Sequence, residues 1–424
     1  MMEFSFPTIL HLGPLGCLTK AKSNRKTVKH DAQQISFLAP SLLTPYFAKT
    51  CTELNISNCG MSELPEAIGT FYRLAILDVS RNQLTLLPVQ IGNLFSLKSF
   101  NVSDNLLSTL PEEFKGLVHL ERLMIHANRL TVVPDAIEAF TKLKELNCYN
   151  NRILHLPNAL GGSNFLTAVK INLAVNTMMR LTMDHVRSWV CVKIMNIYDC
   201  RIFELPSLAH MRSLEELRAY GNNLQTVPDF GANFRSLRSL ELHRNSIRTV
   251  PNGWFPSIPN VKKLTLGVNL LEALPNDLTA QKLEVLYVNH NQLERLPEAI
   301  GFLPLRVLFA QKNKLIGLPW SLLRSNTLKR VNLALNPKIV VTKDFKPVLD
   351  HLTLLCASPL NGGAGRLTMP DVIDDWRDKP PKVQTRRSRE SMKAAENVVT
   401  GGKAPFKREG KKGGARKRNS IAIQ

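Results

Sequence analysis

Aliphatic residues recur along this chain in one fixed frame. Each copy of the frame reads aliphatic-x-x-aliphatic-x-aliphatic-x-x-Asn-x-aliphatic-x-x-aliphatic-Pro, as over residues 74–88 and 120–134. The central polar position is Asn in most copies and Cys in the others, at residues 59, 82, 105, 128, 151, 176, 200, 222, 245, 269, 291, 313 and 336. The spacing of 22 to 25 residues indicates a repeat architecture.

The middle of each frame predicts a short strand. Side chains alternate along a strand, so Leu77 and Val79 are expected to point inward while Asp78 and Ser80 point outward. Each copy can bury its aliphatic residues only against its neighbours, and the copies are therefore expected to stack as a parallel sheet.

The central Asn is expected to bond the backbone of its own turn and of adjacent turns, because its amide both donates and accepts. After the strand comes Leu-Pro-x-x-Ile-Gly-x-Leu, as over residues 87–94 and 296–303, which predicts the convex side of the stack. Proline there sets the chain direction, and glycine is expected to supply a turn that other residues resist.

These motifs resemble leucine-rich repeats, and their LP-x-x-IG-x-L form resembles the Ras-suppressor and scribble-like group over about residues 51–341. The predicted fold class is α/β, a leucine-rich-repeat solenoid or horseshoe with a parallel concave sheet and about 13 repeats. The resemblance implies a scaffold in intracellular signalling.

The repeat boundaries divide the chain into five expected parts. These are a disordered segment at 1–29, an N-terminal cap at 30–50, the solenoid at 51–341, a C-terminal cap at 342–361 and a disordered basic tail at 362–424. Within the solenoid, residues 167–200 depart from the frame. Residues 183–191 there are expected to be locally helical, which favours repeat decay over a functional hinge.

Composition adds a compartment and a charge. None of the seven cysteines forms a CxxC pair, so a reducing, cytoplasmic location is expected. The net charge is +21, and residues 377–424 carry 15 Lys/Arg against 4 Asp/Glu, a net charge of +11. That tail could attract an acidic membrane surface or a nuclear import receptor. Its lack of stacking aromatics argues against nucleic acid.

Candidate binding residues lie at the outward strand positions, where large aromatic, His, Arg and Met side chains gather in repeats four to nine. Tyr and Arg are enriched in binding hot spots, so a protein partner is expected on this concave face. Cross-strand packing is the alternative explanation for such aromatics. The candidate patch is Met124, His126, Tyr149, Tyr198, Arg218, Tyr220, Glu241, His243 and Arg244.

The sequence gives no motif for catalysis, a metal, a cofactor or a small-molecule substrate. The glycine-rich stretch 362–368 lacks the order of a phosphate-binding loop, and His126 and His243 lie five repeats apart, too far to share a metal. The chain is therefore expected not to be an enzyme. As an alternative function, residues 414–424 resemble the start of a PP2C-type phosphatase domain, which implies a regulatory region or short form of such a protein.

Overall fold

The computed structural model describes residues 8–12, 18–20, 45–162, 167–340, 344 and 353–354. The chain divides into two units, 1–358 and 359–424, and the second unit lies entirely outside the described residues. The expected basic tail therefore lies there too. All that follows concerns the first unit.

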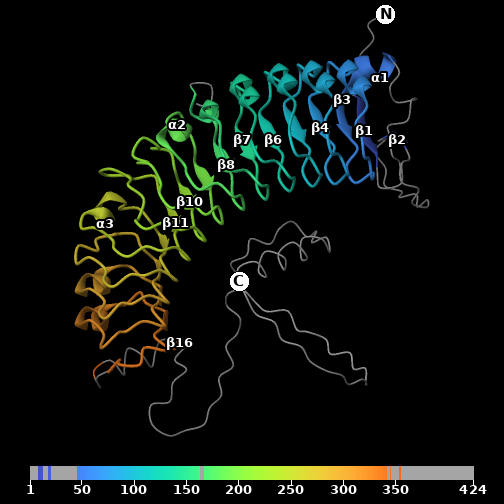
Figure 1. Cartoon of the computed structure of the whole chain (residues 1–424). Coiled ribbons are helices and arrows are strands. Elements are labelled where there is room, and N and C mark those ends of the chain that lie inside the picture. Colours follow the sequence, from blue (N-terminus) through green and yellow to red (C-terminus); the bar gives the residue numbers. More distant parts are fainter. Residues whose placement is uncertain are drawn as a thin grey trace, which may run out of the picture. The chain divides into compact units, whose positions relative to one another are not determined.

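One parallel sheet runs through the repeats, with 13 strands in sequence order and each strand paired with the next (Figure 1). Leu217, for example, is in register with Met195 on one side and Leu240 on the other. The strands are β3 (Cys51–Asn55), β4 (Ile76–Asp78), β5 (Ser99–Asn101), β6 (Arg122–Met124), β7 (Glu145–Asn147), β8 (Lys170–Asn172), β9 (Ile194–Asn196), β10 (Glu216–Arg218), β11 (Ser239–Glu241), β12 (Lys263–Thr265), β13 (Val285–Tyr287), β14 (Val307–Phe309) and β15 (Arg330–Asn332).

Additional strands pair with both edges of this sheet. At the N-terminal edge β1 (Thr8–Leu12) pairs parallel with β3, and β2 (Leu18–Lys20) pairs antiparallel with β1. Residues 1–29 are expected from the sequence to be disordered, whereas residues 8–12 and 18–20 form these two strands. They pair with backbone groups that an exposed edge would leave unpaired. At the other edge β16 (Thr353–Leu354) pairs with β15.

The core lies between the sheet and the convex side. The inward aliphatic residues of each repeat are buried, and Leu77 and Val79 are fully so. Aromatic residues extend this packing, since the Phe114 ring lies 5.6 Å from Phe100 and 6.4 Å from Phe140, centroid to centroid. Ser80, expected to point outward, is itself only 6% exposed. A small side chain on the concave face is therefore largely covered by its neighbours.

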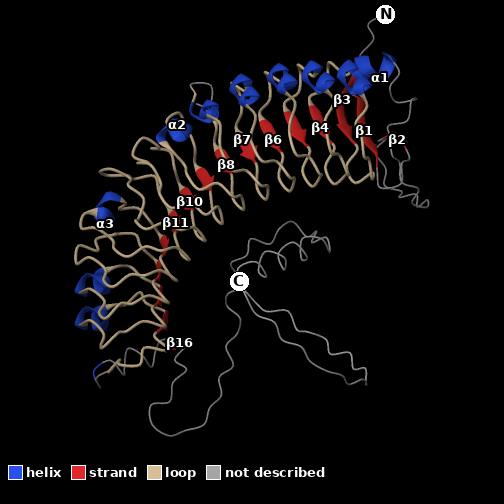
Figure 2. Ribbon diagram, in the orientation of Figure 1, coloured by secondary structure: helices blue, strands red, loops and turns tan. Residues whose placement is uncertain are grey.

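Short helices line the convex side (Figure 2). Most are 3-10 helices that begin after a proline whose φ is near that of a helix, such as Pro88 with φ −67°. Their bounds are η2 (Glu66–Thr70), η3 (Val89–Asn93), η4 (Glu112–Gly116), η5 (Asp135–Ala139), η6 (Asn158–Gly161), η8 (Glu298–Phe302) and η9 (Trp320–Arg324), with α-helices α1 (Pro45–Thr50), α2 (Met183–Val186) and α3 (Trp254–Ser257).

Glycine in these helices has a different role from the one expected. A Cβ on Gly92 would lie 2.2 Å from the carbonyl oxygen of Glu113, and one on Gly116 would lie 2.2 Å from that of Gly92. Neither glycine adopts a left-handed backbone. Glycine is needed because successive helices approach closely, and the expectation of a special turn there was wrong.

The polar position of the repeat forms a buried column, as the sequence predicts. The Asn82 amide donates to the carbonyls of Ile56, Val79 and Ser80 at 2.9, 2.9 and 3.3 Å. Its Oδ1 accepts from the backbone N–H groups of Cys59 and Met61 at 2.9 and 3.1 Å. The Asn82 side chain thus joins two successive repeats. The asparagines at the equivalent position of the other repeats are 5 to 9% exposed, and we call this column the asparagine ladder.

The residue before each ladder position takes a left-handed backbone, with φ between 50° and 64° in all thirteen turns. Only Gly221 among them is a glycine. The two cysteine turns carry a second such residue just after the cysteine, Gly60 with φ 69° and Arg201 with φ 66°. The Cys200 thiol donates to the carbonyl of Leu173 at 3.1 Å, and burial raises its pKa to about 12, so it remains a thiol.

The irregular segment 167–200 keeps the sheet continuous, because β8 and β9 pair in register. Its helical part, α2, begins at residue 183 as the sequence predicts but ends at Val186, short of the expected residue 191. The fully buried Trp189 follows α2, and its indole N–H donates to the carbonyl of Leu160 at 2.8 Å. The departure from the frame is therefore a change on the convex side alone.

Candidate functional site

Three tyrosines and a histidine of the candidate patch form a ladder on the concave face. Tyr198 stacks on Tyr220 with 4.5 Å between ring centroids and an interplanar angle of 8°. Tyr220 stacks on His243 at 4.4 Å and 14°, and Tyr149 lies tilted against Tyr198 at 6.3 Å. We call Tyr149, Tyr198, Tyr220 and His243 the aromatic ladder.

Repeat geometry brings these rings together. All four stand two residues before the ladder asparagine or cysteine, so the strand spacing sets them about 4.8 Å apart in consecutive repeats. Repeat six has Ala174 at this position, fully buried between Tyr149 and Tyr198. Tyr149 and Tyr198 are therefore two repeats apart, and the small side chain of Ala174 lets their rings approach to 6.3 Å, in a tilted arrangement.

The fold does not require aromatics at this position. Repeats two and three have Ser80 and Ser103 there, both under 10% exposed, within the same unbroken sheet. The aliphatic core lies on the other side of the strands. The tyrosines therefore add a surface feature to a scaffold that stands without them.

Charged side chains flank the aromatic ladder and most are paired. The Arg218 guanidinium lies 3.4 Å from the Glu216 carboxylate. Glu241 accepts a charged hydrogen bond from the Lys263 ammonium at 2.6 Å. These contacts hold candidate residues Arg218 and Glu241 in fixed positions beside the rings.

Asp199 is a member of this surface that the sequence reasoning missed. It occupies the left-handed position after Tyr198, and a Cβ on Gly221 would lie 1.9 Å from its Oδ1. Partial burial raises the pKa of Asp199 above its usual range, against the opposing effect of the Arg244 charge. Burial raises the pKa of Tyr149, and the Asp199 carboxylate adds to this shift. Candidate residue Arg244 thus faces an anionic neighbour.

The ladder histidine is held neutral. Burial lowers the pKa of His243 to about 4, although Glu241 opposes the shift. His243 Nδ1 lies 3.0 Å from the Thr265 hydroxyl. At neutral pH the histidine therefore behaves as a stacked aromatic ring rather than as a cation.

The remaining candidates lie at the N-terminal side of the ladder. His126 is in the repeat before Tyr149, and its Nδ1 is buried without a hydrogen-bond partner among the described residues. Burial lowers its pKa. Met124 is half-buried on β6, in register with Asn147 on β7. Neither stacks on the ladder, so the nine candidates form one surface of which only four share ring contacts.

A second aromatic pair lies outside the candidate patch. Tyr287 and Phe309 stack at 4.8 Å and 10°, and both stand between the two inward residues of their strands. This pair provides a matched control for the ladder, with the same chemistry on the same sheet two repeats beyond His243.

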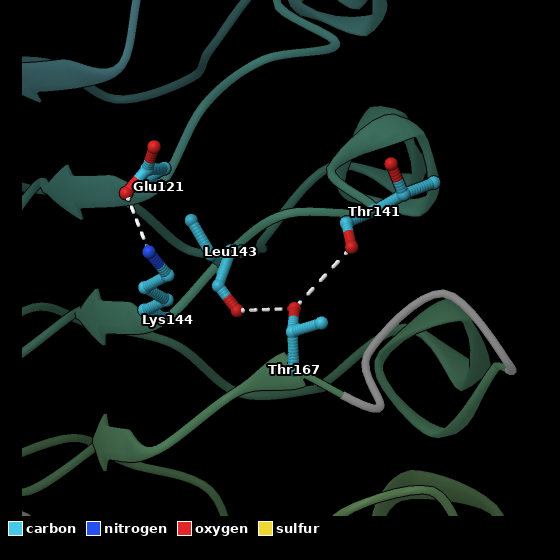
Figure 3. A network of polar contacts seen from close by, with 5 residues as sticks. All are labelled: Glu121, Thr141, Leu143, Lys144 and Thr167. Carbon is cyan, nitrogen blue, oxygen red and sulfur yellow. Dashed lines mark hydrogen bonds and ion pairs between the residues drawn. The ribbon is translucent and has the colours of Figure 1, made fainter.

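An open groove of about 590 Å³ lies where β4 to β8 begin. Figure 3 shows the Lys144 ammonium reaching the Glu121 carboxylate at 2.8 Å beside it, and the Thr167 hydroxyl donating to the Leu143 carbonyl at 2.9 Å. Lys170 likewise pairs with Glu145 at 2.9 Å. The lining charges are largely paired on an open surface, which does not enclose a small molecule.

The described residues hold no group of three or more His, Cys, Asp or Glu placed to bind a metal ion. Among the helices that the structure describes, none has the length and apolar character needed to cross a bilayer.

Two segments of the sequence, 72–130 and 235–293, match the family model for the leucine-rich repeat. Together with the parallel sheet and its asparagine column, this match decides the architecture. The fold is a leucine-rich-repeat solenoid. No curated protein matches the sequence of the chain.

Solved leucine-rich-repeat structures share this fold at low sequence identity. One is a leucine-rich-repeat protein of Leptospira interrogans, with TM-score 0.62 and 24% identity over 76% of each chain. Another is a plant peptide hormone receptor, RGFR1, in complex with RGF2, with TM-score 0.58 and 24% identity over 73% of this chain and 55% of that one.

A third is Toll of Drosophila, from its complex with Spatzle, with TM-score 0.56 and 20% identity over 72% of this chain and 46% of that one. This chain thus spans about half the length of the two receptors that it resembles.

Proposed function

We propose that this leucine-rich-repeat chain is a non-catalytic scaffold or adaptor in intracellular signalling that holds a protein partner on its concave face. The observation that carries the proposal is the aromatic ladder. Its rings stack on one another at a repeat position that is serine in repeats one to three. Stacked rings have already lost rotamer freedom, so a partner that covers them loses less entropy on binding.

Two solved structures support a protein partner. RGFR1 is seen with RGF2, and Toll with Spatzle, and both receptors share this fold. The basic tail, outside the described residues, is proposed as a second contact, to an acidic membrane surface or an import receptor.

The proposal is tested by affinity capture with the full chain, followed by quantitative mass spectrometry. Tyr198→Ala with Tyr220→Ala should lose captured partners, since truncating a hot-spot residue costs about 2 kcal/mol or more, roughly thirtyfold in affinity. Tyr287→Ala with Phe309→Ala should retain them. Equal recovery from the first double variant and the wild type, or loss only in the second, refutes the assignment of the ladder.

A further inference from the structure

Arginines gather on a second surface, formed by the turns that follow the asparagine or cysteine position of each repeat. Arg129, Arg152 and Arg201 each directly follow the ladder residue of their repeat, and Arg180 lies four residues after Asn176. All four side chains are exposed. None of these four arginines takes part in an ion pair within the described residues.

Apolar side chains stand between these arginines. Leu154 is 51% exposed and Met179 is 60% exposed. The Arg180 guanidinium lies 5.0 Å above the Phe203 ring, in a cation–π contact. We call Arg129, Arg152, Arg180 and Arg201, with Leu154, Met179 and Phe203, the turn surface.

Backbone hydrogen bonds hold the turn surface in register from repeat to repeat. The Leu154 N–H donates to the Thr131 carbonyl at 3.0 Å, and the Phe203 N–H donates to that of Met179 at 3.4 Å. The Arg152 N–H donates to the Leu130 carbonyl at 2.9 Å. The surface is thus continuous over repeats four to seven and rests on a rigid backbone.

Arg201 is held at a position whose backbone favours glycine. Its φ of 66° matches that of Gly60, the residue after the other ladder cysteine. A left-handed backbone is unfavourable for a residue with a Cβ. Replacing Arg201 by glycine therefore removes the guanidinium without adding backbone strain.

We propose that the turn surface binds an acidic, leucine-containing segment of a partner protein. The four turns 127–132, 150–155, 175–180 and 199–204 contain these four arginines and only two carboxylates, Asp199 and Glu204, so their excess positive charge is complementary to an acidic chain. The exposed Leu154 and Met179 suit apolar side chains and offer a nucleic acid neither a hydrogen bond nor a stacking plane. Four repeats span about 14 Å, the length of about five extended residues.

The proposal is independent of the aromatic ladder, and the test keeps the two apart. The probe is a fluorescein-labelled peptide of mixed Glu and Leu, and its binding to the full chain is measured by anisotropy. Comparison peptides replace Leu by Ser, and a short oligouridine RNA replaces the peptide. The basic tail is present in every variant, so differences between variants report the solenoid alone.

Arg129→Gln with Arg152→Gln should weaken binding of the Glu/Leu peptide at least about fivefold. The matched control, Arg248→Gln with Arg295→Gln, removes two cations from the same side of later repeats and should bind as the wild type does. Arg201→Gly should weaken binding while the midpoint of thermal unfolding rises or stays unchanged. Tyr198→Ala with Tyr220→Ala should leave binding of this peptide intact.

Three results would overturn the proposal. One is equal peptide binding by the wild type and Arg129→Gln with Arg152→Gln. Another is equal binding of the Glu/Leu and Glu/Ser peptides, which would make the apolar side chains irrelevant. The third is loss of RNA binding but not of peptide binding in the arginine variants, which would assign the surface to nucleic acid.

Discussion

Replacing Asn222 by leucine tests the asparagine ladder in the repeats that carry Tyr198 and Tyr220. The Asn222 amide donates to the carbonyls of Ile197, Ala219 and Tyr220 at 2.8, 3.0 and 3.3 Å. Its Oδ1 accepts the N–H groups of Cys200 and Ile202, both at 3.0 Å. Leucine has a similar size but offers none of these five bonds.

The expected cost follows from the groups left unpaired. Two buried N–H groups lose their acceptor, at about 1–3 kcal/mol each, and the carbonyls lose a shared donor. Asn222→Leu should therefore lower the free energy of unfolding by about 4 kcal/mol. Asn222→Cys should cost less, because the Cys200 thiol already bonds a carbonyl at the equivalent position.

Urea unfolding followed by circular dichroism measures this cost, and amide hydrogen exchange locates it. Because each repeat contacts only its neighbours, exchange should accelerate first in β9 and β10. Asn223→Leu is the matched control, since Asn223 is adjacent and exposed. If Asn222→Leu unfolds at the same urea concentration as Asn223→Leu, the asparagine ladder does not hold the repeats together.

Other substitutions address single features of the fold. Burial lowers the pKa of His243 to about 4, whereas an unfolded histidine titrates near ~6.5, so the unfolded chain takes up the proton first. The free energy of unfolding should therefore fall by up to about 3 kcal/mol as the pH drops from ~6.5 to 4. His243→Phe should reduce this pH dependence, measured by urea unfolding at each pH. Val268→Asn should raise the free energy of unfolding by about 1 kcal/mol, because Val268 has φ 54° and asparagine tolerates this conformation better; no gain in a thermal melt would contradict this reading. Trp189→Phe should cost about 2 kcal/mol by leaving the buried carbonyl of Leu160 without its indole donor, and an unchanged melting midpoint would count against that bond.

The sequence determines the repeat frame more fully than the turns between strands. Leucine and asparagine recur at fixed spacing because every copy buries the same positions, so the parallel sheet and the asparagine column could be predicted. The left-handed residue before the ladder could not, because residues as different as Arg81, Val175 and Leu335 occupy it. Neighbouring contacts fix that conformation, and no residue type marks it.

The alignment of the candidate side chains on one face was predictable from the same repeat frame, whereas their role in binding stays a prediction. Strand alternation placed Tyr198, Tyr220 and His243 on one face, and the structure stacks them. Strand alternation could not reveal Asp199, because this residue reaches the surface from the turn. The absence of a side chain at Gly221 leaves room for its carboxylate. Pairing of β1 with the sheet edge was also missed, because residues 8–12 carry no repeat motif.

The central claim is that a protein partner lies on the concave face, and photo-crosslinking tests it most directly. Benzoylphenylalanine in place of Tyr149 keeps an aromatic side chain at the end of the ladder, and in place of Trp320, which is 58% exposed on η9, it probes the convex side. Irradiation of the full chain with its captured partner should give crosslinked partner from position 149 and none from position 320. Crosslinks from position 320 alone would contradict the account.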